Sequence, residues 1–452
     1  MRKKTDLKLT KTNALTDSVI AISSKSYVHR LIISATLCGR SVTVSTNIMS
    51  ADMEATVRAV NSLGAKVEVL QVPGGGYDIT VKSPLTTGMV KKCVVDCGES
   101  GSTARFILPL APIFADTAVV TGSGRLPERP MGPLCEVLNA AGVNVVPDHL
   151  PITVQGRPKA GEYSIAGNVS SQFISGLLFM LPLLDGSSTL TIEGKLESAG
   201  YVDMTADVMT KFGFDITRRE NAFLINGAES SGCVIPERIE AEGDWSNAAY
   251  IMAIAALGSG TVFDSITIDG LNPDSIQGDR AIIPILRDFG ISVSEDRDGK
   301  AGNAVYTLSG NPSRPVDVDC SQIPDLVPAL AVVAAYTKGD SVFRNVERLR
   351  MKECDRIEAV SEMLSKVGAK VDITSTNGSE NMTVHGKGMN APADHTVIIN
   401  SFNDHRIAMA AAALAVAESM PVIIEDAMAV NKSYPGFFDH IEKLGISSKQ
   451  ET

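Results

Sequence analysis

The chain has 452 residues and a formal net charge of −11; 44% of its residues are hydrophobic, 21% are charged and 5% are aromatic. This composition is typical of a globular protein, and the length predicts two domains of roughly 200 residues, each able to bury most of its apolar surface. The acidic balance and the few aromatic residues argue against a nucleic-acid or anionic-membrane binder. An anionic ligand must therefore be bound by a local group of Lys and Arg.

The sequence shows no membrane segment or export signal. Its longest apolar stretches, 173–184 and 407–417, are shorter than the roughly 20 residues that span a bilayer. The basic N-terminus leads into no continuous apolar region, as a secretory signal would. We therefore expect a cytoplasmic protein with no membrane partner.

Motifs for disulfides, metals and common cofactors are missing from the sequence. The six histidines form no HExxH motif, and no Walker P-loop, GxSxG motif or GxGxxG motif after a strand is present, so we expect no metal and no cofactor. The cysteines are odd in number and form no CxxC pair, which is typical of reduced thiols. They are Cys38, Cys93, Cys97, Cys135, Cys233, Cys320 and Cys354.

One pattern recurs six times along the chain: about three helical turns, an apolar residue, a glycine and a strand-like run. The intervals between these glycines are 78, 71, 77, 78 and 77 residues. Each glycine fits the left-handed position after a helix end, which only glycine adopts cheaply. The glycines are Gly64, Gly142, Gly213, Gly290, Gly368 and Gly445.

A second helix recurs in phase with the first. Its copies have a polar start followed by small apolar residues on nearly all sides, as in 23–39, 99–115, 170–184, 243–258, 323–339 and 403–419. A helix that is apolar on nearly all sides is buried. Each of the six units is therefore predicted to contain an inner helix, a more amphipathic helix and β-rich runs, giving two similar α/β domains of three units each.

The boundary between the two domains is predicted near 239–243, halfway through the repeats. The first domain comprises 23–241. The second comprises 1–22 and 242–452, because the N-terminal strand around 7–15 has no unit of its own.

Charged residues gather at the starts of the predicted inner helices. Lys25 and Ser26 open the first helix, with Arg30 one turn further on, and Gly101 precedes Arg105 in the second. Free backbone N–H groups and the helix dipole favour an anion at such a start. Each motif alone is more often a plain helix cap, but recurrence at equivalent positions favours anion binding.

The starts of the last three units differ because they include carboxylates. Asp244, Asp325 and Asp404 stand at inner-helix starts, where an Asp is a good N-cap, and this structural role is favoured for Asp244. The densest charge cluster lies at 348–356. Such a run is usually a solvated helix face, but here it follows a strand and enters a helix, where anions bind.

These motifs together resemble the family of 5-enolpyruvylshikimate-3-phosphate (EPSP) synthases nearly from end to end. The landmarks stand in order: Lys25-Ser26 with Arg30, Gly101 with Arg105, Pro127-Glu128-Arg129-Pro130, Ser170-Ser171-Gln172, Ser198 with Tyr201, Glu242-Gly243-Asp244, Ile323-Pro324-Asp325, Lys352-Glu353 with Asp355-Arg356, Asn403-Asp404-His405-Arg406, and Lys432.

The resemblance implies two inside-out α/β domains, each of three βαβαββ units, with the active site in the interdomain cleft. It also implies a monomer that transfers the enolpyruvyl group of phosphoenolpyruvate to the 5-hydroxyl of shikimate 3-phosphate and releases phosphate. The implied acid-base residues are Asp325 and Glu353, with Lys25 stabilising developing charge.

The resemblance assigns the two substrates to overlapping sets of residues. Shikimate 3-phosphate would be bound by Lys25, Ser26, Arg30, Ser170, Ser171, Gln172, Ser198, Tyr201, Asp325 and Lys352. Phosphoenolpyruvate would be bound by Lys25, Gly101, Arg105, Arg129, Gln172, Arg356, Arg406 and Lys432.

Three positions depart from the family pattern: Glu99 and Arg348 stand where Asn is frequent, and Phe106 stands where Pro is common. They affect the expected shape of the phosphoenolpyruvate pocket and leave the catalytic groups in place. Two rival functions stay open. An enolpyruvyl transferase acting on UDP-N-acetylglucosamine would carry a Cys on the loop at 122–127, which has none, and a ring-shaped clamp on nucleic acid would not need the charged clusters at unit starts.

Overall fold

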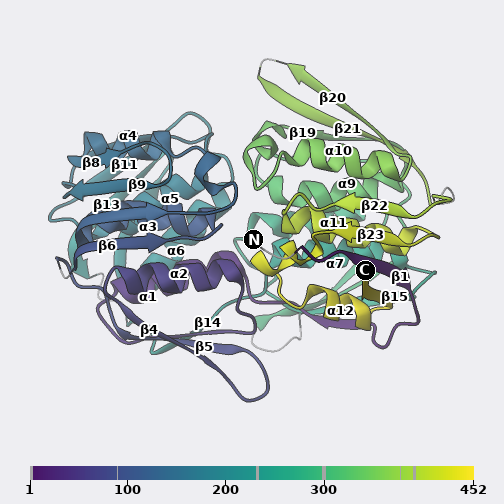
Figure 1. Cartoon of the computed structure of the whole chain (residues 1–452), viewed down its shortest axis with the longest axis horizontal. Helices are drawn as coiled ribbons and strands as arrows, with labels where there is room; N and C mark the ends of the chain where they lie inside the picture. The colour runs from purple at the N-terminus through teal and green to yellow at the C-terminus, as the bar shows by residue number, and fades with distance from the viewer. Residues whose placement is uncertain are drawn as a thin grey trace. The chain divides into compact units, whose positions relative to one another are not determined.

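The computed structural model describes residues 4–88, 90–230, 234–297, 302–376, 378–389 and 393–451 (Figure 1). Within these ranges the strands form six four-stranded sheets. The chain divides into two compact units, one made of 25–241 and the other of 1–24 together with 242–452. The expectation of an active-site cleft between the two domains stays a prediction.

The unit 25–241 contains three sheets, each accompanied by two helices. The first sheet has the order β14-β3-β5-β4, the second β6-β7-β9-β8 and the third β10-β11-β13-β12. In each, the first two strands are parallel and the others antiparallel. The elements are α1 (Lys25–Leu37), β3 (Thr43–Thr46), α2 (Ala51–Ser62), β4 (Lys66–Gln71), β5 (Tyr77–Ser83), β6 (Val90–Asp96), α3 (Gly101–Phe114), β7 (Ala115–Thr121), α4 (Gly132–Ala140), β8 (Val143–Val146), β9 (Ile152–Gly156), β10 (Glu162–Ala166), α5 (Ser171–Met180), β11 (Ser188–Glu193), α6 (Ala199–Lys211), β12 (Phe214–Arg219), β13 (Ala222–Ser230) and β14 (Arg238–Glu240).

The unit that holds both termini repeats this plan. Its sheets have the orders β16-β17-β15-β2, β18-β19-β21-β20 and β22-β23-β1-β24. The elements are β1 (Leu7–Lys11), β2 (Ser18–Ile20), α7 (Trp245–Gly258), β15 (Ser265–Leu271), α8 (Ile282–Asp288), β16 (Ser292–Asp296), β17 (Ala304–Ser309), β18 (Asp317–Asp319), α9 (Val327–Ala335), β19 (Lys338–Arg344), α10 (Arg356–Lys366), β20 (Lys370–Thr376), β21 (Ser379–Lys387), β22 (Val397–Asn400), α11 (His405–Ala417), β23 (Val422–Glu425), α12 (Phe437–Lys443) and β24 (Ile446–Gln450).

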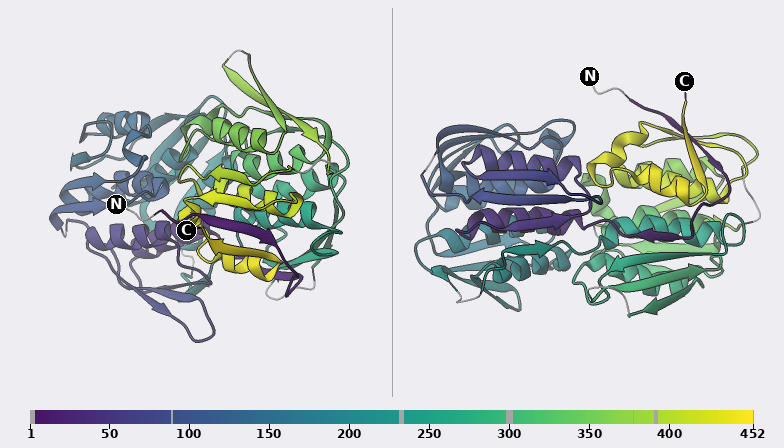
Figure 2. Two further views of the ribbon diagram at one scale, coloured as in Figure 1. Left: turned by 45° about the vertical axis from the view of Figure 1, so that its right-hand side comes forward. Right: turned by 90° about the horizontal axis from the view of Figure 1, so that it is seen from below.

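Three strands do not pair with the sheet of the helix that follows them in the chain. β2 precedes α1 but pairs in parallel with β15, and β14 precedes α7 but pairs in parallel with β3. β1 lies between β23 and β24, antiparallel to both, and fills the place that a fourth strand of the sixth unit would take. Figure 2 shows the purple β1 beside the yellow C-terminal strand.

The six predicted glycines all adopt the left-handed backbone conformation directly after a helix. Their φ angles are 107°, 93°, 89°, 94°, 82° and 90° in chain order. A side chain at this position meets the following carbonyl, so only glycine adopts it without strain. This confirms the repeat that the glycine spacing predicted.

The inner helices form the centres of the two cores. Every residue of α7, α9 and α11 is buried, and these three helices pack on one another (Figure 1). Their many alanines allow close approach of the helix axes, and burial of apolar surface is the main stabilising contribution. Among the described residues no helix is both long and apolar enough to cross a membrane.

Candidate active site

Two groups of charged and polar side chains lie at the starts of the inner helices, one group in each unit. The group in the unit 25–241 begins with Lys25, the first residue of α1. Its Nζ lies 2.9 Å from Oδ2 of Asp52, and both side chains are only slightly exposed. Asp52 belongs to the first turn of α2, whose N-cap Ser50 accepts a hydrogen bond from the N–H of Met53. Lys25 is thus held by a carboxylate that the sequence analysis did not single out.

Arg30 is buried one turn beyond Lys25 and connects three helices. Its guanidinium donates to Oγ1 of Thr205 at 2.8 Å, to the carbonyl oxygen of Ser26 at 2.8 Å and to that of Tyr201 at 2.9 Å. The Cζ atom of Arg30 also lies 5.0 Å from the centroid of the Phe106 ring. Burial lowers its pKa to about 10, against an opposing effect of Tyr201. Arg30 is therefore fixed by neutral acceptors before a substrate arrives.

The starts of α3 and α5 are joined by Gln172. Its amide donates to Oγ of Ser102 at 2.8 Å and its carbonyl oxygen accepts from Arg105 at 2.7 Å. Ser170 is the N-cap of α5 and accepts from the backbone N–H of Gln172. Ser170 and Gln172, the donors predicted for the third unit, therefore belong to one hydrogen-bonded group with Arg105, the cation predicted for the second unit.

Two guanidinium groups lie against Gly101, the first residue of α3. A Cβ at this position would stand 2.5 Å from Nη1 of Arg129 and 3.0 Å from Nη1 of Arg105. Burial, together with repulsion by Arg129, lowers the pKa of Arg105 well below its ordinary value. The absence of a side chain at Gly101 leaves room for both guanidinium groups, and an anion bound beside them would relieve their repulsion.

Asp325 is the centre of the second group. It lies in a 3-10 turn at Pro324–Leu326, directly before α9. Its carboxylate lies 2.8 Å from Arg356, 3.3 Å from Arg406 and 3.5 Å from Lys352. Burial alone would raise the pKa of Asp325, but the charges of these three cations hold it well below its usual range. Asp325 is therefore ionised in the free protein.

Arg356 is shared between Asp325 and Asp404. Asp404 caps α11 by accepting from the N–H of Arg406, and its carboxylate also accepts from Nε of Arg356 at 2.7 Å. Burial and the attraction of Asp404 act in opposite directions on Arg356, and its pKa is raised. The sequence motif around 403–406 predicted the cap, but not that the same carboxylate holds Arg356.

Glu353 lies next to two cations or potential cations. One carboxylate oxygen lies 3.1 Å from Nδ1 of His405, and the other lies 3.6 Å from Nζ of Lys432. Burial acts to raise the pKa of Glu353, but the charges of His405 and Lys432 hold it well below its usual range. Lys432 also donates to the carbonyl oxygen of Asn403 at 2.6 Å. Glu353 and Asp325 are thus two largely buried, ionised carboxylates in one group.

Lys352 has an ammonium group whose pKa is lowered toward neutral pH. Burial lowers its pKa to about 8, against the attraction of Asp325 and with the help of Arg348. Arg350, two residues earlier, contacts Glu380 and Asp355 and stabilises the loop before α10. The charge cluster predicted at 348–356 therefore divides between the candidate site and a structural ion-pair network.

Asp244 has the structural role that the sequence analysis favoured. It is the N-cap of α7, and its carboxylate accepts from the N–H of Asn247 at 2.7 Å. In the part of the chain that the structure describes, only Glu353, Asp404 and His405 bring three potential metal ligands together. Because Arg356 and Lys432 contact these carboxylates, we assign the three residues to ion pairs.

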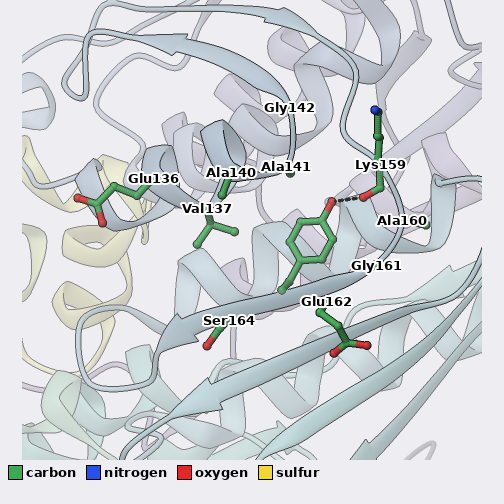
Figure 3. A pocket seen from close by; sticks show the side chains of 11 residues that line it. Glu136, Val137, Ala140, Ala141, Gly142, Lys159, Ala160, Gly161, Glu162 and Ser164 are labelled. Atoms are coloured by element: carbon green, nitrogen blue, oxygen red, sulfur yellow. Dashed lines mark hydrogen bonds between the residues drawn. The ribbon is translucent and has the colours of Figure 1, made fainter.

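A hollow of about 570 Å³ lies elsewhere in the unit 25–241, between the end of α4 and β10. Figure 3 shows Glu136 and Lys159 on opposite sides of it. The Tyr163 hydroxyl in its wall already donates to the carbonyl oxygen of Lys159 at 2.6 Å. No residue predicted to bind substrate lines this hollow, so it does not belong to the candidate active site.

Comparison with known proteins identifies the family of the chain. The family model of EPSP synthase (3-phosphoshikimate 1-carboxyvinyltransferase) matches residues 9–441. The 3-phosphoshikimate 1-carboxyvinyltransferase of Clostridium novyi (strain NT) is 38% identical over 431 residues, covering 93% of each chain. The enzyme of the same name from Methanothrix thermoacetophila is 34% identical over 444 residues, covering 97% of this chain and 98% of the relative.

Solved structures show the same fold. An EPSP synthase from Acinetobacter baumannii superposes with a TM-score of 0.76 at 22% identity, covering 99% of this chain and all of the other. The enolpyruvyl transferase NikO from Streptomyces tendae gives a TM-score of 0.76 at 16% identity, with full coverage of both chains. Together with the extent of the sequence matches, this shows that the chain belongs to the EPSP synthase family, the 3-phosphoshikimate 1-carboxyvinyltransferases.

Proposed function

We propose that this chain carries out the reaction of its family with two groups of residues that divide the binding and the acid-base chemistry between them. The reaction transfers the enolpyruvyl group of phosphoenolpyruvate to the 5-hydroxyl of shikimate 3-phosphate and releases phosphate, the step before chorismate in aromatic amino-acid biosynthesis. The observation that carries the proposal is the pair of largely buried, ionised carboxylates, Asp325 and Glu353, held among Lys and Arg side chains.

Shikimate 3-phosphate is assigned chiefly to the helix starts of the unit 25–241. Lys25 and Ser26 open α1, Ser171 and Gln172 open α5 behind their cap Ser170, and α6 begins directly after Ser198. Backbone N–H groups and hydroxyls at helix starts suit a phosphate and a polyhydroxylated ring. Arg30 and Tyr201 complete the assigned set in this unit, and the family resemblance adds Asp325 and Lys352 to the assignment.

Phosphoenolpyruvate is assigned to the clustered guanidinium and ammonium groups. It carries a carboxylate and a phosphate, and both need cations that are fixed in place. Arg105 and Arg129 face Gly101 in one unit, and Arg356 and Arg406 contact Asp325 in the other. The remaining assigned ligands are Lys25, Gln172 and Lys432.

The two carboxylates supply the proton transfers that the reaction needs. The 5-hydroxyl loses a proton as it attacks C2 of phosphoenolpyruvate, and C3 gains one, which gives a tetrahedral intermediate. C3 then loses a proton as phosphate leaves. Asp325 and Glu353 are both ionised in the free protein, so each begins as a proton acceptor. Lys25 stabilises the negative charge that develops during these steps.

The reaction is tested by ³¹P NMR of purified protein with both substrates. Inorganic phosphate should appear in step with the loss of phosphoenolpyruvate, and only when shikimate 3-phosphate is present. Phosphate release with UDP-N-acetylglucosamine in place of shikimate 3-phosphate would refute the assignment.

We further propose that the protein acts as a cytoplasmic monomer. The cysteines Cys38, Cys93, Cys97, Cys135, Cys320 and Cys354 carry free thiols, which supports a reducing compartment, and Cys233 lies outside the described residues. Light scattering coupled to size exclusion should give a mass near the 47.8 kDa of one chain, and a mass of twice that value would contradict the monomer.

A further inference from the structure

A chain of four buried polar side chains crosses the core of the unit 25–241. Nδ1 of His29 lies 2.6 Å from Oγ1 of Thr56, which lies 2.7 Å from Oγ1 of Thr103, which lies 2.8 Å from Oγ of Ser100. All four side chains are at most 1% exposed. Burying polar groups costs free energy, and apolar residues of similar shape would fill this space without that cost. A buried hydrogen-bonded chain of this kind therefore calls for an explanation.

The direction of the hydrogen bonds follows from the surroundings of His29. Burial and the charges of Lys25 and Arg30 lower its pKa well below the ordinary value, so the ring is neutral and carries one N–H. Nε2 is buried with no hydrogen-bond partner among the described residues. A buried N–H without a partner costs more than a buried lone pair, so the proton sits on Nδ1 and donates to Thr56. With its oxygen accepting from His29, the Thr56 hydroxyl can donate to Oγ1 of Thr103 at 2.7 Å or to the carbonyl oxygen of Asp52 at 3.5 Å, and the shorter contact favours Thr103.

These side chains join α1, α2 and α3, and the starts of α1 and α3 carry candidate site residues. His29 lies four residues after Lys25 on α1, and Thr56 lies four residues after Asp52 on α2. Residues four apart share one face of a helix, so the Lys25–Asp52 ion pair and the His29–Thr56 hydrogen bond are successive links between the same two helices. Thr103 and Ser100 extend the second link to the start of α3, next to Gly101.

We propose that His29, Thr56, Thr103 and Ser100 form a positioning network for the reaction, which holds the starts of α1, α2 and α3 in register. Without it, Lys25 would keep its ion pair with Asp52, but its distance from Gly101 and Arg105 would no longer be fixed. This inference rests on the proposed function, because it concerns the alignment of the residues assigned to the two substrates.

The test compares Thr56→Val, which removes the hydroxyl at nearly constant shape, with Thr56→Ser, which retains it. The matched control is Thr36→Val, since Thr36 is equally buried in α1 and its hydroxyl donates only within that helix, to the carbonyl oxygen of Ile33. We expect kcat of Thr56→Val to fall about tenfold to a hundredfold at a temperature where every variant is folded. KM should change much less, and Thr56→Ser and Thr36→Val should keep kcat within about twofold of the unmodified chain.

A Thr56→Val variant with the kcat of Thr36→Val would show that the network contributes only to stability and would overturn the proposal. If Thr56→Val does not fold, Thr103→Val decides by the same criterion, because it leaves the His29 donor paired with Thr56. An unmodified chain that releases no phosphate would refute the proposed function itself. An active unmodified chain with an unimpaired Thr56→Val variant would refute the positioning network alone.

Discussion

Asp325 contacts three cations, which explains its ionisation and fits its proposed role as a proton acceptor. The charges of Arg406, Lys352 and Arg356 keep the carboxylate ionised although it is largely buried. A buried carboxylate in such a position loses hydration but keeps electrostatic compensation, so it is poised to take a proton once substrate binding redistributes the charges.

Replacing Asp325 by Asn tests this role while keeping the shape of the side chain. We expect kcat to fall by about 10² to 10⁴, because an amide cannot accept the proton, while the Kd for shikimate 3-phosphate changes little. Steady-state kinetics and calorimetric titration measure the two effects. Asp244→Asn is the control, since Asp244 caps α7. Turnover of the Asp325 variant at the level of the control would remove Asp325 from the mechanism.

The lowered pKa of Lys352 predicts that the reaction depends on pH. Its pKa of about 8 means that its positive charge is present below pH 8 and is lost as the pH rises through that value. Because the charge is assigned to binding an anionic substrate, kcat/KM for shikimate 3-phosphate should decrease above about pH 8. Lys352→Arg stays charged, so its decrease should move to higher pH. Identical profiles for both proteins would contradict the assignment.

The sequence predicted many members of the two groups because they stand at helix starts that recur along the chain. The structure brings Asp325, Lys352 and Arg356 of the fifth unit together with Arg406 of the sixth. Asp52 was missed because an Asp in the first turn of an amphipathic helix is ordinary, and only the 2.9 Å contact with Lys25 distinguishes it.

Among the secondary-structure elements, the six glycines that follow helices mark the ends of these helices in each repeat unit. Two of them, Gly368 and Gly290, share a similar backbone conformation but differ in the space around them. Gly368 and Gly290 have φ angles of 82° and 94°. A Cβ at Gly368 would meet nothing within 4 Å, whereas one at Gly290 would stand 2.2 Å from Oγ of Ser313. Gly368→Ala therefore carries only the cost of the left-handed backbone, and Gly290→Ala adds the displacement of a neighbour.

We expect Gly368→Ala to lower the free energy of unfolding by about 1 to 2 kcal/mol, the cost of the left-handed conformation for an L-residue. Gly290→Ala should lower it further, since Ser313 must move as well. Urea denaturation with an unchanged m-value measures both. Equal losses in the two variants would show that Ser313 yields without cost. A stabilised Gly368→Ala would contradict the conformational argument.

The sequence predicted the helices and the six units, but not the exchange of short strands. β2 and β14 have three residues each, too few to show an alternating pattern, and they pair with β15 and β3 across long separations in the sequence. The end of a helix can be predicted from the sequence because a single glycine marks it. The partner of a three-residue strand is decided by the tertiary fold, which a local pattern does not contain.

At the scale of the whole molecule, the two units differ in how much of the chain each needs. The unit 25–241 is one continuous segment that includes all strands of its three sheets. The other unit needs β1 and β2 from the N-terminus to complete two of its sheets. We expect the fragment 25–241 to retain its core. The fragment 242–452 lacks β1, which joins β23 to β24, and β2, which covers the edge of β15, so it would expose unpaired strands.

We therefore expect the fragment 25–241 to fold cooperatively on its own and the fragment 242–452 to remain unfolded or aggregate. Circular dichroism during thermal unfolding and dispersion of amide signals in NMR measure both. Cooperative folding of 242–452 without the N-terminal strands would contradict this account of the sheets.

We propose that this chain transfers an enolpyruvyl group by addition and elimination, with Asp325 and Glu353 moving the protons. The most direct measurement is mass spectrometry of the product formed from phosphoenolpyruvate and shikimate 3-phosphate in D₂O. Because C3 gains a solvent deuteron and then loses one of its three hydrogens, the account predicts an enolpyruvyl ether with deuterium in its methylene group, formed much more slowly by Asp325→Asn and Glu353→Gln. Full product without deuterium, or product formed at undiminished rates by both variants, would contradict it.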